Sequence, residues 1–297
     1  MQKTIYGFIG LGNMGGLMAG RLLAAGETVH VVDRDAAAVA RLTEKGAIAQ
    51  PTPVALGNIS DVIFLSIPDG NVLNSVVCGA DGLVGATRVK QVVDLSTVGP
   101  DAAKAAFSAL AAQGITYIDS PVSGGIAGAQ DGTLAVMVSC PRPDYDALQP
   151  ILKNFGPLFY MGAHAGQAQV MKLANNLLSA TAVAITAEAM ALGVKSGLNP
   201  ATMLDVINAG SGRNSATVAK FPKAVLTGTY NIGFTARLAH KDVRLCLAEA
   251  ESIGIPMIVG SAVKEMLMVT TAALGKDADY TDLSRVVENW AGIKIRG

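Results

Sequence analysis

Two different hydrophobic periods divide the chain. From residue 1 to about 160, short apolar and β-branched runs alternate with alanine-rich stretches whose apolar positions recur every three or four residues. Strands that alternate with helices of this length indicate right-handed crossovers and a mainly parallel sheet. The pattern predicts helices such as 35–46 and 101–114, and buried strands at 4–10, 28–33, 61–68, 91–96, 115–122, 133–139 and 156–162.

After about residue 163 only the helical period remains. Residues 165–197 can form one helix of about thirty residues, ended by Gly197 with Pro200 beyond it. We therefore expect an α/β domain of the Rossmann type at 1–162, a doubly wound and mainly parallel sheet. An all-α domain at 163–297 should follow, entered through the long helix. Further helical patterns lie at 199–210, 240–254, 259–275 and 282–292.

A glycine-rich turn joins the first predicted strand to the next helix, in the sequence GFIGLGNMGGLMAGRLL at 7–23. In such a turn the first glycine permits the bend, the second lets the backbone approach a pyrophosphate, and the third packs helix on strand. Backbone amides at the helix N-terminus then face the phosphates. This predicts a dinucleotide site at Gly10, Leu11, Gly12, Asn13, Met14 and Gly15; a purely structural tight turn is the alternative.

The next predicted strand ends in an acid, Asp33. A carboxylate at this position can bind the adenosine ribose diol, and its charge would repel a 2′-phosphate, so NAD is the favoured cofactor. Arg34 could instead pair with that phosphate or stack on the adenine, which keeps NADP as the alternative. Without a nucleotide, Asp33 would be a solvated strand end and Arg34 an ordinary surface charge.

Charge and composition exclude some classes of protein. Lysines plus arginines equal the acids at 23 each, so the formal net charge is zero and we expect no nucleic-acid binding. Hydrophobic residues make up 51% of the chain and charged residues only 15%, which indicates extra buried surface. We expect a homodimer or homotetramer, because the small residues of the long helix allow a second subunit to approach closely.

The cysteines and the apolar stretches indicate the cellular compartment of the protein. Cys78, Cys140 and Cys246 are far apart and form no C-x-x-C pair, which fits a reducing compartment. The N-terminal sequence has no long apolar signal core, and the apolar stretch 177–194 is flanked and interrupted by polar residues. We therefore expect a cytoplasmic protein without a membrane-spanning segment.

Other catalytic patterns are absent from the sequence. His30, His164 and His240 form no metal-binding constellation, and no H-E-x-x-H spacing occurs, so we predict no metal. The glycine turn lacks the G-K-[ST] of a P-loop, which disfavours an ATPase. No G-x-S-x-G elbow of a serine hydrolase is present.

Four short blocks together resemble the β-hydroxyacid dehydrogenase family. They are FIGLGNMGGLMA near the N-terminus, DSPVSGG (119–125), GQAQVMKLANN (166–176) and HKD (240–242). They occur in the order found in that family, and the resemblance covers essentially the whole chain. The segment 211–222 is only loosely similar, and members of the family differ there by substrate.

The resemblance implies a role for each matching residue. It implies a catalytic lysine at Lys172, with Asn176 one turn later on the same helix. It further implies that Ser123, Gly124 and Gly125 cradle a substrate carboxylate. The residues implied around the cofactor are Thr97 and Lys241 near the nicotinamide and Pro68 in a lining loop.

The residues themselves allow two interpretations at each position. Lys172 can extend its ammonium to solvent, or it can point into a cleft where desolvation lowers its pKa and suits it to proton transfer. The S-G-G sequence can be a flexible loop, or an anion nest built from Ser123 and two glycine amides. The STVGP sequence can place Ser96 or Thr97 at a helix cap, or a hydroxyl at the nicotinamide.

We therefore expect an NAD-dependent oxidoreductase acting on a small 3-hydroxy acid, or in reverse on the matching semialdehyde. Lys172 would be the general base in oxidation and the general acid in reduction, with Asn176 orienting substrate or lysine. One alternative is an oxidative decarboxylase of the 6-phosphogluconate dehydrogenase type. The other is a non-catalytic module that senses dinucleotides.

Overall fold

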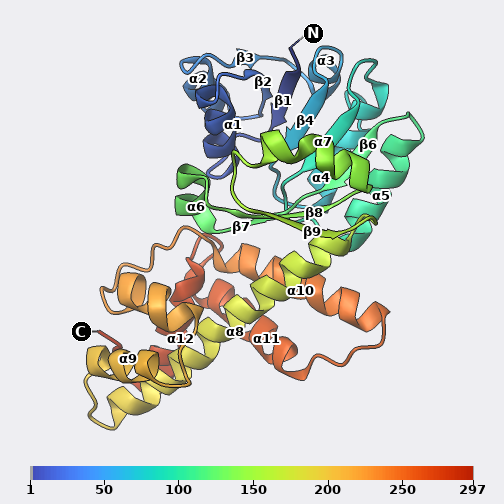
Figure 1. Ribbon diagram of the computed structural model, residues 1–297. Coiled ribbons are helices and arrows are strands. Elements are labelled where there is room, and N and C mark those ends of the chain that lie inside the picture. The colour runs from blue at the N-terminus through green and yellow to red at the C-terminus, as the bar shows by residue number, and fades with distance from the viewer. Residues whose placement is uncertain (1–2, 297) are drawn as a thin grey trace. The chain divides into compact units, whose positions relative to one another are not determined.

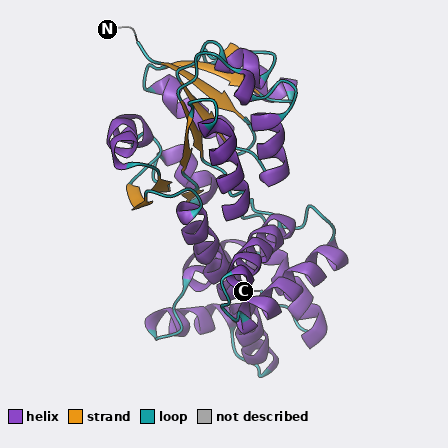
Figure 2. Cartoon of the chain, turned by 90° about the vertical axis from the view of Figure 1, so that its right-hand side faces the viewer, coloured by secondary structure: helices purple, strands orange, loops and turns teal. Residues whose placement is uncertain are grey.

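The computed structural model describes residues 3–296. Internal contacts divide the chain into one unit up to Lys172 and a second unit from Leu173. All strands of the described residues belong to the first unit, and the second is built from helices (Figure 2). This confirms the predicted fold class. The division lies within the long helix, later than the boundary expected at 162/163, because that helix begins in the first unit and continues into the second.

The first unit contains a nine-stranded sheet with the order β3-β2-β1-β4-β5-β6-β8-β7, and β9 pairs with β8 (Figure 1). Neighbouring strands from β3 to β6 are parallel, whereas β8 runs antiparallel to β6 and β7. Each predicted strand is present in shortened form, and the two-residue strands β3 and β7 were not predicted. The strands are β1 (Ile5–Ile9), β2 (Thr28–Val32), β3 (Ile48–Ala49), β4 (Val62–Leu65), β5 (Gln91–Asp94), β6 (Thr116–Asp119), β7 (Val122–Ser123), β8 (Ala135–Ser139) and β9 (Leu158–Gly162).

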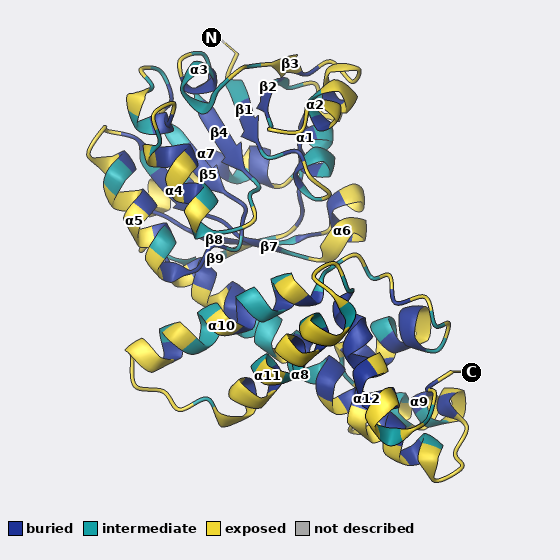
Figure 3. Cartoon of the chain, turned by 180° about the vertical axis from the view of Figure 1, so that it is seen from behind, coloured by how far each residue is buried: buried dark blue, intermediate teal, exposed yellow. Residues whose placement is uncertain are grey.

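Helices cover both faces of this sheet, and their buried residues form two separate clusters. Successive strand residues point to opposite faces, so Phe8 joins one cluster and Ile9 the other. The first cluster packs under α1, α2 and α7, and the second under α3, α4 and α5. Figure 3 shows the central strands β4 and β5 between them as mostly buried. The helices are α1 (Gly15–Ala24), α2 (Ala36–Thr43), α3 (Pro53–Gly57), α4 (Gly70–Cys78), α5 (Pro100–Ala111), α6 (Gly125–Asp131) and α7 (Arg142–Leu152), with the 3₁₀ turn η1 (Leu83–Gly85).

The strand order places the glycine turn, Pro68 and Thr97 of the first unit at one edge of the sheet. Strands β2 and β3 are added on one side of β1, and β4, β5 and β6 are added on its other side, so the direction of strand addition reverses between β1 and β4. Ligands of doubly wound sheets bind at such a point. Because β1, β4, β5 and β6 are parallel, their carboxyl ends meet there. The loops that follow these four strands are residues 10–14, 66–69, 95–99 and 120–121.

The second unit packs its helices around part of α8. The core of the second unit contains four small residues of α8, Ala180, Val183, Ala184 and Ala187. Small side chains allow neighbouring helices to approach α8 closely. As predicted, α8 ends before Gly197, which has a φ of 90°. The helices are α8 (Gln167–Lys195), α9 (Pro200–Ala209), the π-helix η2 (Ala216–Val225), α10 (Ala236–Ser252), α11 (Ile258–Leu274), the 3₁₀ turn η3 (Tyr280–Asp282) and α12 (Leu283–Ala291).

The length and apolar composition of α8 would allow it to cross a membrane. Half of its most apolar window is nevertheless buried within the protein, and the core helix of a soluble protein passes the same test. A single helix of this kind is therefore weak evidence for a membrane span.

Candidate active site

The three glycines of the first turn face different surroundings. Gly10 has a φ of 90°, and a Cβ there would collide with the carbonyl oxygen of Ser66. A Cβ on Gly15 would collide with the carbonyl oxygen of Gly10, so helix α1 can approach β1 only with glycine there. Around Gly12 a Cβ would meet no atom within 4 Å. The turn is thus tight at both ends and open in the middle.

The open part of the turn presents unused backbone donors. Gly12 and Asn13 are exposed, and the N–H groups of residues 12–14 donate no hydrogen bond to any of residues 3–296. The first bond inside the helix runs from the Gly16 N–H to the Gly12 carbonyl, at 2.9 Å. Unpaired amides at a helix N-terminus are suited to hold an anion such as a phosphate.

Asp33 is hydrogen-bonded to the glycine turn. Its Oδ2 accepts a hydrogen bond from the Leu11 N–H, and its Oδ1 accepts one from the Asp35 N–H at 2.7 Å. The carboxylate is half-buried and keeps further lone pairs for a ligand. Arg34 is exposed and makes no hydrogen bond or ion pair with the rest of the described chain.

Ser96 connects the two loops that carry Pro68 and Thr97. The Ile67 N–H donates to Ser96 Oγ at 2.9 Å, while the Ser96 N–H donates to Oδ1 of Asp94 at 2.9 Å. Helix α5 begins after Gly99, which makes no side-chain cap. The interpretation of Ser96 or Thr97 as a helix cap is therefore wrong, because the chain needs three more residues to reach the helix. The Thr97 side chain is half-buried and Pro68 is exposed.

The side-chain amide of Gln169 joins the start of α8 to the Thr97 loop. Its Oε1 accepts hydrogen bonds from the N–H groups of Val98 and Gly99 at 3.0 and 3.1 Å. Its Nε2 donates to the Ser96 carbonyl at 3.1 Å and to Asp119 Oδ1 at 2.7 Å. Gln169 is fully buried, so all four hydrogen bonds are shielded from water.

Asp119 completes this anchor from the end of β6. Its Oδ2 accepts hydrogen bonds from the N–H groups of Gly166 and Gln169, at 3.0 and 3.2 Å. Burial, and secondarily the charge of Asp94 on the neighbouring strand, raises the pKa of the Asp119 carboxyl to about 6 against three hydrogen bonds that lower it. Asp119 and Gln169 lie within the sequence blocks DSPVSGG and GQAQVMKLANN, but no role was predicted for either.

Lys172 follows this anchor by one helical turn. The lysine is only 9% exposed, which excludes a side chain extended freely to solvent. The Ser123 segment also starts from the anchor, because Asp119 ends the strand that precedes it. Ser123 ends β7, and Gly124 and Gly125 after it are exposed.

In the second unit the structure brings Asn176 and Lys241 to the same carboxylate, Asp242. Asn176 Nδ2 donates to Asp242 Oδ2 at 2.6 Å and accepts at its own Oδ1 from Asn175. Lys241 Nζ lies 3.2 Å from Asp242 Oδ1 and forms an ion pair with it. Asp242 is only 2% exposed, and no role was predicted for it from the sequence.

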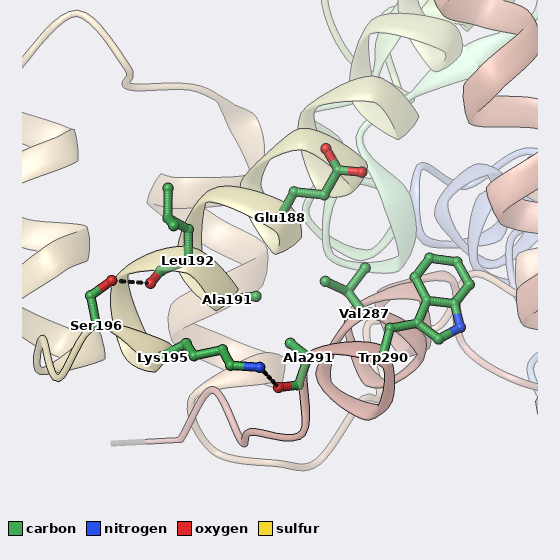
Figure 4. A pocket seen from close by; sticks show the side chains of 8 residues that line it. All are labelled: Glu188, Ala191, Leu192, Lys195, Ser196, Val287, Trp290 and Ala291. Atoms are coloured by element: carbon green, nitrogen blue, oxygen red, sulfur yellow. Dashed lines mark hydrogen bonds between the residues drawn. The ribbon is translucent and has the colours of Figure 1, made fainter.

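Neither a metal-binding group nor the pocket found in the second unit is part of the candidate active site. Among residues 3–296 no three His, Cys, Asp or Glu side chains are arranged to hold a metal ion. A pocket of about 380 Å³ lies between α12 and the C-terminal end of α8. Figure 4 shows its mostly apolar lining, in which Lys195 Nζ donates to the Ala291 carbonyl at 2.7 Å. Glu188 is the lining residue nearest to Lys172 along α8, and it is still about 24 Å away along the helix axis, so this pocket is separate from the candidate site.

Comparisons with known proteins cover the whole chain. Residues 5–166 match the family model described as the NAD binding domain of 6-phosphogluconate dehydrogenase. Residues 166–287 match the model described as NAD-binding of NADP-dependent 3-hydroxyisobutyrate dehydrogenase.

Curated relatives and solved structures agree with these models. A 2-(hydroxymethyl)glutarate dehydrogenase of Eubacterium barkeri is 36% identical, covering 100% of this chain and 99% of its own. A 3-hydroxyisobutyrate dehydrogenase of Pseudomonas aeruginosa is 37% identical over 94% of this chain and 95% of its own. The structure of the Mycobacterium tuberculosis 3-hydroxyisobutyrate dehydrogenase with L-serine has a TM-score of 0.87 at 28% identity, covering 96% of this chain and 99% of that one.

Proposed function

The chain belongs to the β-hydroxyacid dehydrogenase family, and we propose that it transfers a hydride between NAD(P) and a small 3-hydroxy acid or the matching semialdehyde. The observation that carries this proposal is the burial of Lys172, 9% exposed, directly after the anchored first turn of α8. A buried lysine that is held in place this way is suited to proton transfer, unlike a surface lysine whose ammonium is fully hydrated.

The glycine turn fits a dinucleotide. The unpaired amides of residues 12–14 would hold the pyrophosphate, and the open space around Gly12 allows its approach. Asp33 would bind the ribose diol with its remaining lone pairs, which favours NAD over NADP. Pro68, Thr97 and Lys241 would line the nicotinamide end. When bound, the nicotinamide supplies the hydride acceptor or donor.

The residues of the chain itself supply the proton and the orientation. Lys172 Nζ would accept the proton of the substrate hydroxyl in oxidation and return it to the developing alkoxide in reduction. Ser123 and the amides of Gly124 and Gly125 would hold the substrate carboxylate. Asn176, fixed by its 2.6 Å hydrogen bond to Asp242, would orient the substrate hydroxyl.

The test is a near-ultraviolet assay of the reduced cofactor with a panel of 3-hydroxy acids and semialdehydes, run with NAD and with NADP. Lys172→Ala should lower kcat by about 10²- to 10⁴-fold and leave the NAD dissociation constant within about twofold. Lys153→Ala, at an exposed lysine of α7's C-terminal end, is the matched control and should change neither. An equal loss of NAD affinity in Lys172→Ala would assign this lysine to cofactor binding instead.

A homodimer or homotetramer is part of this proposal. Met171, Leu178, Ile185 and Leu192 recur every seven residues along α8 and are 43, 71, 55 and 72% exposed. Such a repeat forms one stripe on a helix, and a second copy could bury it. Light scattering that finds a monomer at micromolar concentration would refute this.

We also propose a cytoplasmic location. All three cysteines are free, and one of them, Cys78, is exposed, as expected in a reducing compartment. Cell fractionation that recovers the protein outside the cytoplasm would contradict it.

A further inference from the structure

One arginine of the helix that follows the glycine turn reaches two distant segments of the first unit. Arg21 lies in the last turn of α1, and its Nη1 donates to the Gln130 carbonyl of α6 at 2.9 Å. Its Nε donates to the carbonyl of Asn154, just after α7, at 2.5 Å. The guanidinium thus ties α1 to α6 and to the segment after α7.

The chain leaves room for this guanidinium at the end of α6. The helix is followed by Gly132, which has a φ of 72°, and a Cβ there would collide with the Arg21 side chain. Gln130 belongs to the last turn of α6, where carbonyl groups have no partner within the helix. A cation is favoured there, because it satisfies such a carbonyl and interacts well with the helix dipole.

Helix α6 buries little that could fix its position without Arg21. Of its seven residues only Gly128 and Ala129 are buried, and these two have almost no side chain to pack. A helix of this length is not stable alone, so its tertiary contacts decide where it lies. Helix α1 is fixed by contrast, because Met18 and Leu22 are fully buried in the core of the unit. Arg21 therefore holds a weakly packed helix to a firmly packed one.

The start of α6 carries the two glycines of the proposed carboxylate cradle. Ser123 is fixed separately, because β7 pairs with β8 and Ser123 lies opposite Ala135. Gly124 and Gly125 are exposed and have φ values of 143° and 67°, so no side chain holds them and their amides follow the position of α6. Gly125 lies only about 8 Å from Gln130 along the helix axis, so a tie at Gln130 also constrains the first turn.

We propose that Arg21 is a positioning residue for substrate binding: by holding α6 to α1, it sets the amides of Gly124 and Gly125 in the geometry that binds the substrate carboxylate. This rests on the proposed function and deepens it by adding a residue on which the carboxylate cradle depends. Arg21 acts through α6 and needs no contact with the substrate. The same helix α1 would hold the pyrophosphate at its N-terminus, so one helix sets the position of both anions.

The kinetic test compares Arg21→Met with the native chain, using 3-hydroxyisobutyrate and the cofactor that the native chain prefers. Methionine keeps the apolar stem and removes the guanidinium, and the buried residues of α1 are unchanged, so the fold should be retained. KM for the hydroxy acid should rise about tenfold or more, because hydrogen bonds to a carboxylate are strong and depend on geometry. The carboxylate is held alike in the ground and transition states, so kcat should stay within about twofold. The cofactor dissociation constant should also stay within about twofold.

A conservative variant and a control complete the kinetic series. Arg21→Lys should recover part of the loss in KM, because an ammonium can still donate to one of the two carbonyls. If Arg21→Met does not fold, Arg21→Lys carries the same comparison. Arg41→Met is the matched control, because Arg41 is exposed in the last turn of α2 in the same unit. It should leave KM unchanged.

Hydrogen–deuterium exchange of peptides covering residues 122–131 measures the hold on α6 without turnover. In the free chain, exchange in this segment should be about tenfold faster or more in Arg21→Met than in the native protein. Exchange in peptides of α1 should not change, because its buried face remains packed. Arg41→Met should exchange like the native protein in both segments.

The outcomes separate this inference from the proposed function. Unchanged exchange at 122–131, or faster exchange with an unchanged KM, overturns the inference, and so does an equal loss of cofactor affinity. If no hydroxy acid or semialdehyde is turned over with either cofactor, the proposed function fails, and calorimetry with isobutyrate decides the inference instead. Arg21→Met should then bind isobutyrate at least tenfold more weakly than the native chain. Equal binding by the two chains, or no binding by either, overturns the inference.

Discussion

Exchanging Gln169 for glutamate tests the anchor that holds the start of α8. The substitution keeps the shape of the side chain and replaces the donating Nε2 by an oxygen. The two hydrogen bonds accepted from Val98 and Gly99 remain possible. The two donated to Ser96 and Asp119 become contacts between oxygen atoms.

The cost follows from what is left without a partner. A buried acceptor that loses its hydrogen bond costs about 1–3 kcal/mol, and two are affected here. One of them is the carboxylate of Asp119, so the new carboxylate at position 169 also adds like-charge repulsion. We therefore expect Gln169→Glu to lower the free energy of opening of this region by about 3–5 kcal/mol.

A second substitution should restore part of that loss. In Asp119→Asn combined with Gln169→Glu, the new Nδ2 can donate to the new carboxylate. The asparagine oxygen can still accept from the N–H groups of Gly166 and residue 169. Asp119→Asn alone should destabilise, because its Nδ2 would face the donating Nε2 of Gln169. The coupling free energy of this double-mutant cycle should therefore be at least about 2 kcal/mol in favour of the double variant.

Hydrogen–deuterium exchange of peptides covering residues 96–99 is the appropriate assay. The single tryptophan, Trp290, is in the second unit, so its fluorescence would not report directly on this anchor in the first unit. Gln149→Glu is the matched control, because Gln149 Nε2 donates to Asp146 at 3.1 Å on the surface. It should cost less than about 0.5 kcal/mol.

The reasoning would be refuted by either of two results. The first is a Gln169→Glu effect no larger than that of Gln149→Glu. The second is a double variant whose loss equals the sum of the two single losses. In either case the buried amide would not be holding the loop and α8 together through these hydrogen bonds.

The remaining predictions concern the glycine turn and the buried acid. Gly12→Ala should weaken NAD binding by about tenfold or more at unchanged stability, because its Cβ would occupy the open space of the turn, as calorimetry can measure. Gly15→Ala should instead lower the free energy of unfolding by at least about 2 kcal/mol, because its Cβ would collide with Gly10; equal thermal stability of the two variants would contradict this. The folded-state pKa of Asp119, about 6, exceeds its unfolded value of 3.8, so its contribution to stability is complete below about pH 4 and declines as pH rises to about 6. The free energy of unfolding of the native chain relative to Asp119→Asn should thus fall by up to about 3 kcal/mol across that range, as urea unfolding can measure. A difference between the two that does not change with pH would contradict the raised pKa of Asp119.

Much of the fold follows from local patterns in the sequence. The apolar runs predicted each of the longer strands, because a strand buried on both faces must be apolar throughout. The small residues of α8 predicted a long packed helix, and Gly197 its end. Three local features had no such signal. Strands β3 and β7 have only two residues each, and η2 contains Pro222, so none of them shows a regular period.

The polar partners of the site could not be read from the sequence in the same way. Gln169 bonds Asp119 and Ser96, which are 50 and 73 residues away along the chain. Nothing in the local spacing distinguishes Gln169 from a solvated glutamine such as Gln149. The same holds for Asp242, whose partner Asn176 is 66 residues away.

The sequence by itself determined the sheet, the glycine turn and the long helix, because hydrophobic period and glycine geometry act between neighbours in the chain. Only the tertiary structure decided which polar groups lose water together, as Gln169 and Asp119 do in the first unit and Asn176 and Asp242 do in the second. Hydrogen bonds and pKa shifts depend on distances of a few ångströms and on burial, and both exist only after distant segments have packed.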